Sequence, residues 1–183
     1  MNWTSRPSKP RLTSAAGALI AAVLSAPATA DGLLEVEQTV FGMDCAPCAY
    51  SVEKSLNRLQ GVVTVNVRLN EGKVRLILAP GNRVTLQEIR RRILDGGFTP
   101  MDGYVRAAGK LVSRDGKLEL AIAPGTTFRL QPGGPGSAHW QALIAAPAGA
   151  TADITGRVAE TGGDPFVLTV DKLMRLSGAP SAG

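Results

Sequence analysis

Residues 42–48 read Gly-Met-Asp-Cys-Ala-Pro-Cys, and the sequence on either side places them between a strand and a helix. The residues before this stretch are apolar at intervals of two or four, as on one face of a strand: Leu34, Val36 and Val40. The residues after it are apolar at helical intervals: Cys48, Val52, Leu56 and Leu59. Gly61 is expected to end this helix. The two cysteines therefore lie where a loop enters a helix.

Further strands and a second helix are predicted downstream. Apolar residues alternate with polar ones in the next strand, at Val63, Val65, Val67 and Leu69. Residues 70–73, Asn-Glu-Gly-Lys, predict a hairpin turn into a strand over residues 74–78. The second helix is expected to begin at Thr85, with Glu88 completing a capping box, and to end at Gly96. Its predicted apolar stripe comprises Leu86, Ile89, Ile93 and Leu94.

A last short strand is expected near Phe98. We place it at the edge of a sheet because Pro100 lacks the amide hydrogen that a central strand donates. The order strand, helix, strand, strand, helix, strand predicts a ferredoxin-like βαββαβ domain over residues 31–102, with one sheet covered by two helices. The fold class expected for the chain is therefore α+β.

The cysteine pair has the spacing of a functional dithiol. A disulfide across so short a loop would constrain the unfolded chain little, so a purely structural bridge is the weaker interpretation. The N-terminus of a helix carries partial positive charge and free N–H groups, which stabilise the thiolates of Cys45 and Cys48. Pro47 suits the first helical turn, where its missing N–H would have no partner. A site with only two good ligands stays open and can pass an ion on.

The motif Gly42-Met43-x-Cys45-x-x-Cys48, with the element order that follows it, resembles the heavy-metal-associated domain. That domain occurs in copper chaperones, in metal-exporting P-type ATPases and in periplasmic mercury-binding proteins. The resemblance covers residues 31–101 and implies that Cys45 and Cys48 are the metal ligands. It implies a buried Met43 that holds the loop, and a Phe98 that packs beside the thiolates. The implied partner is a metal-transporting membrane protein or a metalloprotein acceptor.

The identity of the metal stays open at this point. Paired thiolates select soft or borderline ions, so Cu(I), Zn(II) and Hg(II) are all candidates. Asp44 stands where copper-type members commonly have Thr, Ser or His, and where some zinc- and cadmium-exporting ATPases have Asp as a third ligand. A carboxylate oxygen suits Zn(II) better than Cu(I). Asp44 is therefore either a third metal ligand or a solvated loop residue.

Residues 103–176 are predicted to form a small all-β, barrel-like domain of the oligonucleotide-binding type, and residues 177–183 a flexible tail. The expected strands, with no helix among them, cover residues 105–112, 117–122, 126–130, 140–144, 152–158 and 166–170. Asp115-Gly116 predicts a hairpin turn, and residues 131–136 form a break rich in Gly and Pro. Residues 150–158 faintly resemble the later strands of such a barrel, which indicates architecture and not function.

Residues 1–30 match the pattern of a secretory signal peptide. Basic residues come first, an apolar run covers residues 15–24, and small residues follow at Ala28-Thr29-Ala30. The apolar run is about half of the roughly 20 residues that a membrane-spanning helix needs. The alternatives are an uncleaved anchor or a buried core helix. We expect a mature chain that begins at Asp31, is periplasmic or secreted, and does not span a membrane.

Charge and composition exclude several classes of function. The formal charge is +5, and Arg6, Lys9 and Arg11 account for +3 of it, so the rest of the chain is too weakly basic for a nucleic-acid-binding surface. The chain has a single histidine, His139, and we find no catalytic triad and no glycine-rich phosphate loop. His139 is interpreted as an ordinary surface or partly buried residue. The sequence therefore predicts a metal-binding protein and not an enzyme.

Two alternatives remain. Cys-Ala-Pro-Cys resembles the thioredoxin motif Cys-Gly-Pro-Cys, which would make the chain a thiol–disulfide oxidoreductase. Against this, thioredoxin-like chains have more structure before the motif, and Asp44 replaces their usual Trp. The other alternative is an adaptor whose β-rich domain docks a partner.

Overall fold

The computed structural model describes Met1, residues 31–122 and residues 126–178. The predicted signal peptide beyond Met1, and most of the predicted tail, lie outside the described residues. None of the helices in the described ranges combines the length and the apolar composition needed to cross a bilayer.

The first half has the predicted order of elements. These are β1 (Gly32–Phe41), α1 (Ala46–Leu56), β2 (Val62–Arg68), β3 (Lys73–Leu78), α2 (Leu86–Asp95) and β4 (Thr99–Arg114). The four strands are antiparallel and lie side by side in the order β2-β3-β1-β4. Helix α1 packs against α2 and β2, and α2 against β1 and β4. This is the ferredoxin-like arrangement that the sequence predicts.

Local signals place two boundaries in this half. The turn between β2 and β3 is a short 3-10 helix, η1 (Leu69–Glu71), followed by Gly72 with a left-handed φ of 61°. Helix α2 begins at Thr85, whose Oγ1 accepts a 3.0 Å hydrogen bond from the amide of Glu88. Both the hairpin turn and the helix start are confirmed.

The apolar stripe of α2 differs from the prediction at one position. Leu86, Ile89 and Ile93 are buried, but Leu94 is 55% exposed. Arg90, which lies outside the predicted stripe, is only 6% exposed. The difference arises because the second half of the chain covers the flank of α2 that carries Arg90, as hydrogen bonds described below show.

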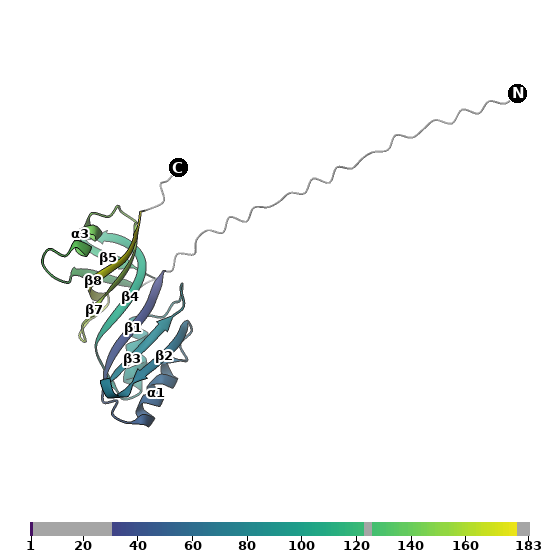
Figure 1. The fold of residues 1–183 in the computed structure, drawn as a ribbon, viewed down its shortest axis with the longest axis vertical. Helices are drawn as coiled ribbons and strands as arrows, with labels where there is room; N and C mark the ends of the chain where they lie inside the picture. Colours follow the sequence, from purple (N-terminus) through teal and green to yellow (C-terminus); the bar gives the residue numbers. More distant parts are fainter. Residues whose placement is uncertain (2–30, 123–125, 179–183) are drawn as a thin grey trace.

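Strand β4 is not the short edge strand that the sequence predicts. It has 16 residues, pairs along one side first with β1 and then with β5 (Lys117–Ala121), and pairs along the other side with β7 (Thr151–Val158). Pro100 is paired with Val40 of β1, and the β7 pairing begins only at Gly103. The first residues of β4 therefore pair on one side only, with β1. Figure 1 shows β4 continuing from one half of the molecule into the other.

The second half closes into a barrel-like sheet. It contains β5, β6 (Thr127–Pro132), α3 (Ala138–Ile144), β7 and β8 (Phe166–Ser177). The strand order β4-β5-β6-β8-β7 returns to β4 through the β4–β7 pairing. The β6–β8 pair is parallel and the other pairs are antiparallel. The predicted Asp-Gly turn joins β4 to β5, with φ of 51° at Asp115 and 70° at Gly116.

Residues 140–144 are helical and not the strand that we predicted. The amide of Trp140 donates a 3.4 Å hydrogen bond to the Ser137 side chain, which caps the N-terminus of α3. Trp140 and Leu143 both pack towards the core, three residues apart as on one helical face. A helix of seven residues offers too few turns for that period to be recognised in the sequence.

Two glycines allow strands of the barrel to approach closely. A Cβ at Gly109 of β4 would clash with the carbonyl oxygen of Ala121, and a Cβ at Gly156 of β7 with that of Thr169.

Buried apolar residues of both halves belong to one continuous core cluster. The boundary predicted between residues 102 and 103 falls inside β4.

Candidate metal centre

The loop between β1 and α1 carries the cysteine pair. It leaves β1 through Gly42, which has a left-handed φ of 88°, and Met43 is then 2% exposed. The chain emerges at Asp44 and Cys45, both exposed, before α1 begins. The buried methionine thus anchors a loop whose next residues face solvent, as the resemblance implies.

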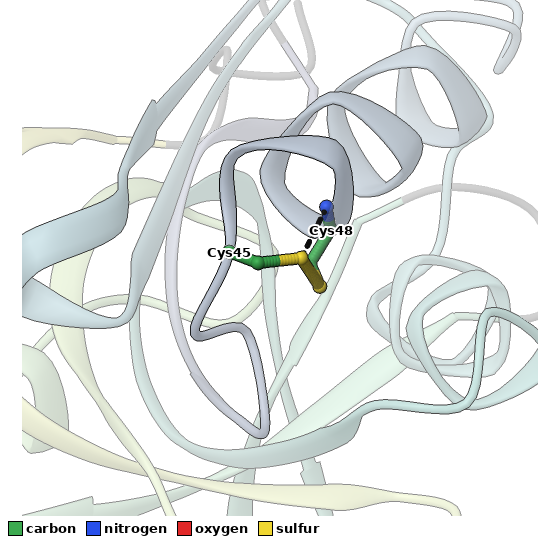
Figure 2. The surroundings of a disulfide bond; sticks show 2 residues. All are labelled: Cys45 and Cys48. Atoms are coloured by element: carbon green, nitrogen blue, oxygen red, sulfur yellow. Dashed lines mark hydrogen bonds between the residues drawn. A yellow bond between two sulfur atoms is a disulfide. The ribbon is translucent and has the colours of Figure 1, made fainter.

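Cys45 is the N-cap of α1. Its backbone is extended, with φ of −137° and ψ of 152°, and its Sγ accepts a 3.1 Å hydrogen bond from the amide of Cys48. Pro47 occupies the first turn. Figure 2 shows both side chains at this end of the helix, with the hydrogen bond from the Cys48 nitrogen drawn to the Cys45 sulfur. A sulfur at this position is held where the helix end favours negative charge.

The two sulfurs are joined as a disulfide, with their Cα atoms 5.1 Å apart. The geometry therefore brings both predicted ligands to one point. Coordination of a soft ion requires thiolates, so this bond must first be reduced. Two electrons and two protons convert the disulfide into two thiols, and loss of the thiol protons then yields the ligands.

The two cysteines differ in accessibility. Cys45 is exposed, whereas Cys48 is partly buried and packs against the hydrophobic core. Phe98, also partly buried, lies near the start of the loop: a Cβ built at Gly42 would lie 4.0 Å from its ring. An incoming group would therefore reach Cys45 first.

The structure does not gather Asp44 or His139 with the cysteines. Within residues 31–122 and 126–178, no three His, Cys, Asp or Glu side chains cluster closely enough to hold a metal ion. Asp44 is exposed in the loop, and His139 lies on α3 in the barrel half. The pair of sulfurs is what this loop offers to an ion.

Charged residues are distributed unevenly between the loop and the body of α1, which the sequence did not reveal. A cavity of about 550 Å³ beside Gly42 is lined by four carboxylate residues from four separate segments: Asp44, Glu71, Asp102 and Glu160. A cavity of about 450 Å³ between α1 and α2 is lined instead by Lys54, Arg58 and Arg92, with Asp95. No sequence pattern links Glu160 to the loop, because only the closure of the barrel brings it there.

The exposed face of the sheet carries ion pairs close to this region. Glu37 pairs with Arg68 at 2.6 Å and with Lys73 at 3.3 Å. Burial raises the pKa of Glu37, but the hydrogen bonds from Lys73 and Arg68 outweigh it and hold the pKa below its ordinary value. Glu37 is therefore held as a carboxylate.

Comparison with known proteins matches the first half of the chain. Residues 38–99 match the model of the heavy-metal-associated domain. Copper-transporting ATPase HMA5 of Oryza sativa subsp. japonica is 39% identical over 77 residues, which cover 41% of this chain and 8% of the ATPase. Copper chaperone CopZ of Staphylococcus saprophyticus is 36% identical over 59 residues, which cover 32% of this chain and 85% of the chaperone.

Among solved structures, a CopZ metallochaperone is 29% identical, with 36% of this chain and 97% of that chain covered and a TM-score of 0.35. The chain spans less than a tenth of the length of the copper-transporting ATPases that it matches, and most of the length of the chaperone.

Proposed function

This chain belongs to the heavy-metal-associated domain family through residues 38–99, and from that premise we propose that it is an exported copper carrier. It binds one Cu(I) ion between the thiolates of Cys45 and Cys48 and passes the ion to a protein acceptor, either a metal-transporting membrane protein or a metalloprotein. The relatives named as copper chaperones and copper-transporting ATPases support copper as the cargo.

The observation that carries this proposal is the convergence of two sulfurs at an exposed loop, with no third His, Cys, Asp or Glu of the described residues clustered beside them. Cu(I) is a soft ion that thiolates select, whereas structural Zn(II) is almost always bound by four ligands. In the described residues, nothing gathers with Cys45 and Cys48 to complete a zinc site. A two-sulfur site at the surface therefore favours Cu(I) that is held for transfer.

The position of each sulfur supports directional transfer. The ion, bound by two thiolates, leaves a net negative charge that the free N–H groups at the start of α1 stabilise. Exposed Cys45 is the sulfur that an acceptor thiolate displaces first, while partly buried Cys48 keeps hold of the ion. Exchange of one ligand at a time avoids releasing free copper.

Loading requires a reductant, because the cysteines form a disulfide in the structure. We assign this step to a dithiol donor: its thiolate attacks one sulfur, a mixed disulfide forms, and its second thiolate releases the protein as a dithiol. The donor becomes a disulfide, so the two electrons are balanced. Copper binding is thereby coupled to the redox state of the compartment.

Anaerobic titration of the reduced protein tests the function. Cu(I), Zn(II) and Hg(II) are added singly and then in competition, with a chelator of known affinity present to buffer each ion. The proposal expects one Cu(I) per chain, retained against excess Zn(II). Binding of Zn(II) in preference to Cu(I), or of neither ion, would overturn it. Hg(II) is more thiophilic than Cu(I), so it is expected to displace Cu(I) while the stoichiometry stays at one ion per chain.

The disulfide favours one second candidate, a thiol–disulfide oxidoreductase that uses the same cysteines. An insulin-reduction assay separates the two, because a carrier should turn over slowly and be inhibited by bound metal. Fast turnover with no dependence on metal would select the oxidoreductase.

Export is supported by the pattern of residues 1–30. N-terminal sequencing of the protein recovered from the cell envelope should begin at Asp31. Recovery of the chain from the cytosol with Met1 intact would refute the periplasmic or secreted location.

A further inference from the structure

A cavity of about 530 Å³ lies where the two halves of the chain meet. One wall is the flank of α2 with Arg90, Arg91 and Leu94, and another is the β7–β8 loop with Gly162, together with Phe166 at the start of β8. The start of β4 completes the lining, and no residue of the Gly42–Cys48 loop takes part. Its size is within the range of about 300–1,000 Å³ that is usual for small-molecule sites.

Arg90 supplies a buried cation in the lining of this cavity. Its Nε donates to the side-chain oxygen of Gln38 at 3.1 Å, its Nη1 to the carbonyl of Glu160 at 3.1 Å, and its Nη2 to the carbonyl of Met101 at 3.2 Å. The guanidinium also lies 5.2 Å from the centre of the Phe166 ring. Every one of these partners is uncharged, although the side chain is only 6% exposed.

The positive charge of Arg90 lacks a direct counter-ion. Across the described residues it forms no ion pair, and burial lowers its pKa while the carboxylates of Asp102 and Glu160 only partly oppose this. Since a guanidinium has five N–H groups and three donate as described, two remain. A buried charge without an anionic partner is costly, so an anion that entered the cavity would be stabilised.

The remainder of the lining suits an apolar body with a single charge. The surface is mainly apolar, with the half-exposed side chain of Leu94 facing the same space as Phe166 and Pro100. Glu160 and Asp164 also line it, and their carboxylates would repel a multiply charged anion such as phosphate. The lining therefore selects for one negative charge on an otherwise apolar molecule.

We infer that this cavity is a binding site for a small apolar carboxylic acid, whose carboxylate accepts hydrogen bonds from Arg90 and whose apolar body lies between Leu94 and Phe166. The site depends on both halves of the chain, since the first half contributes α2 and the second contributes the β7–β8 loop. It is independent of the cysteines, so its failure would leave the copper proposal untouched.

Titration of the full chain with 3-phenylpropionate, and separately with the neutral 3-phenylpropanol, tests the site. Isothermal calorimetry measures each affinity, and NMR chemical shifts identify the amides that respond. The acid should bind at least about tenfold more tightly than the alcohol, because a hydrogen bond to a charged group is worth over a kcal/mol. The shifts should centre on α2 and the β7–β8 loop. Equal affinities, or shifts elsewhere, would overturn the inference.

Two matched variants locate the binding. Leu94→Glu and Ile144→Glu each add one carboxylate at an exposed helical position, but only Leu94 lines the cavity. The first should weaken 3-phenylpropionate at least tenfold and the second should leave it unchanged; equal effects of the two would refute the site. Arg90→Met, if it folds by circular dichroism, should abolish the preference for acid over alcohol. If it does not fold, the Leu94 and Ile144 pair decides alone.

Discussion

At the scale of single residues, the two cysteines differ in position and in exposure to solvent. Cys45 precedes α1 as its N-cap and is exposed, whereas Cys48 lies inside the first turn and packs against the core. Both sulfurs lie at the helix N-terminus, where partial positive charge favours thiolates over thiols. Neither sulfur alone satisfies a soft ion.

Cys45→Ser and Cys48→Ser should each abolish tight Cu(I) binding, with stoichiometry falling from one to near zero. The fold should survive in both, because the core does not depend on the metal, and circular dichroism of the reduced proteins would show this. A single variant that still binds one ion tightly would place the ligands elsewhere, and His139 would be examined next.

Asp44 is expected to matter little for metal choice. It is exposed and does not gather with the two cysteines into a three-ligand cluster. Asp44→Ala should therefore change the affinities for Cu(I) and Zn(II) by less than about threefold, which is under 1 kcal/mol. A selective loss of Zn(II) binding by tenfold or more would instead establish Asp44 as a third ligand.

At the scale of elements, close packing of strands governs the barrel half. Gly109 lies on β4 where an added Cβ would meet the carbonyl of Ala121, whereas Gly134 has open space around it and lies in the β6–α3 connection. Tolerance of a side chain should therefore differ sharply between the two glycines.

Gly109→Ala should lower the free energy of unfolding by about 1–3 kcal/mol or more, as overpacking does when backbone must move. Gly134→Ala should stay within about 0.5 kcal/mol of the parent, as surface substitutions usually do. Urea denaturation of the two variants measures both values. Similar losses in both would show that the strands do not approach as closely as described.

The exposed face of the sheet should make stability depend on acid. Because the pKa of Glu37 is lower in the folded chain than its ordinary value of 4.5, the ion pairs with Arg68 and Lys73 contribute stability above that pH. This contribution is lost as the pH falls through the folded pKa. It is small, under about 1 kcal/mol, since such pairs near the surface are screened.

Glu37→Gln should therefore lose less stability than the parent between pH 7 and pH 3, as measured by urea unfolding at both pH values. Glu53→Gln is the control, because Glu53 forms no ion pair among the described residues. An identical acid dependence in all three proteins would contradict the role of Glu37.

At the scale of the whole molecule, two features join the halves. Strand β4 pairs with β1 in the first half and with β5 and β7 in the second, and the buried apolar residues form one cluster. Gln38, which is fully buried, adds a polar link: its side chain donates to the carbonyl of Met101 and accepts from Arg90, which reaches Glu160. The halves should unfold together.

A single cooperative transition is therefore expected in urea. Far-UV circular dichroism reports on both halves, and the fluorescence of Trp140 reports on the barrel half, so the two curves should coincide. Gly109→Ala should move both midpoints equally. Two separated transitions would show that the halves fold independently.

Local patterns were sufficient to predict the order of elements in the first half, although not the end of α1, which lies at Leu56 and not at Gly61. The apolar period of α1, the capping of α2 at Thr85 and the turn at Gly72 each depend on a few neighbouring residues, so their spacing in the chain indicates their structure. The cysteine pair belongs to the same class, because two ligands three residues apart at a helix start are already close in sequence. The element order, the loop and its two candidate ligands could therefore be predicted from the sequence alone.

Only the tertiary structure determined how the second half packs against the first and which residues of the first half it covers. The length of β4 and the burial of Arg90 follow from β7 and the β7–β8 loop packing beside β4 and α2. Glu160 lines the cavity beside Gly42, and the cavity at Arg90 exists, for the same reason. These contacts join residues that are far apart in the chain and are brought together by barrel closure and core packing. Such contacts produce no local periodicity in the sequence, so they could not be predicted from it.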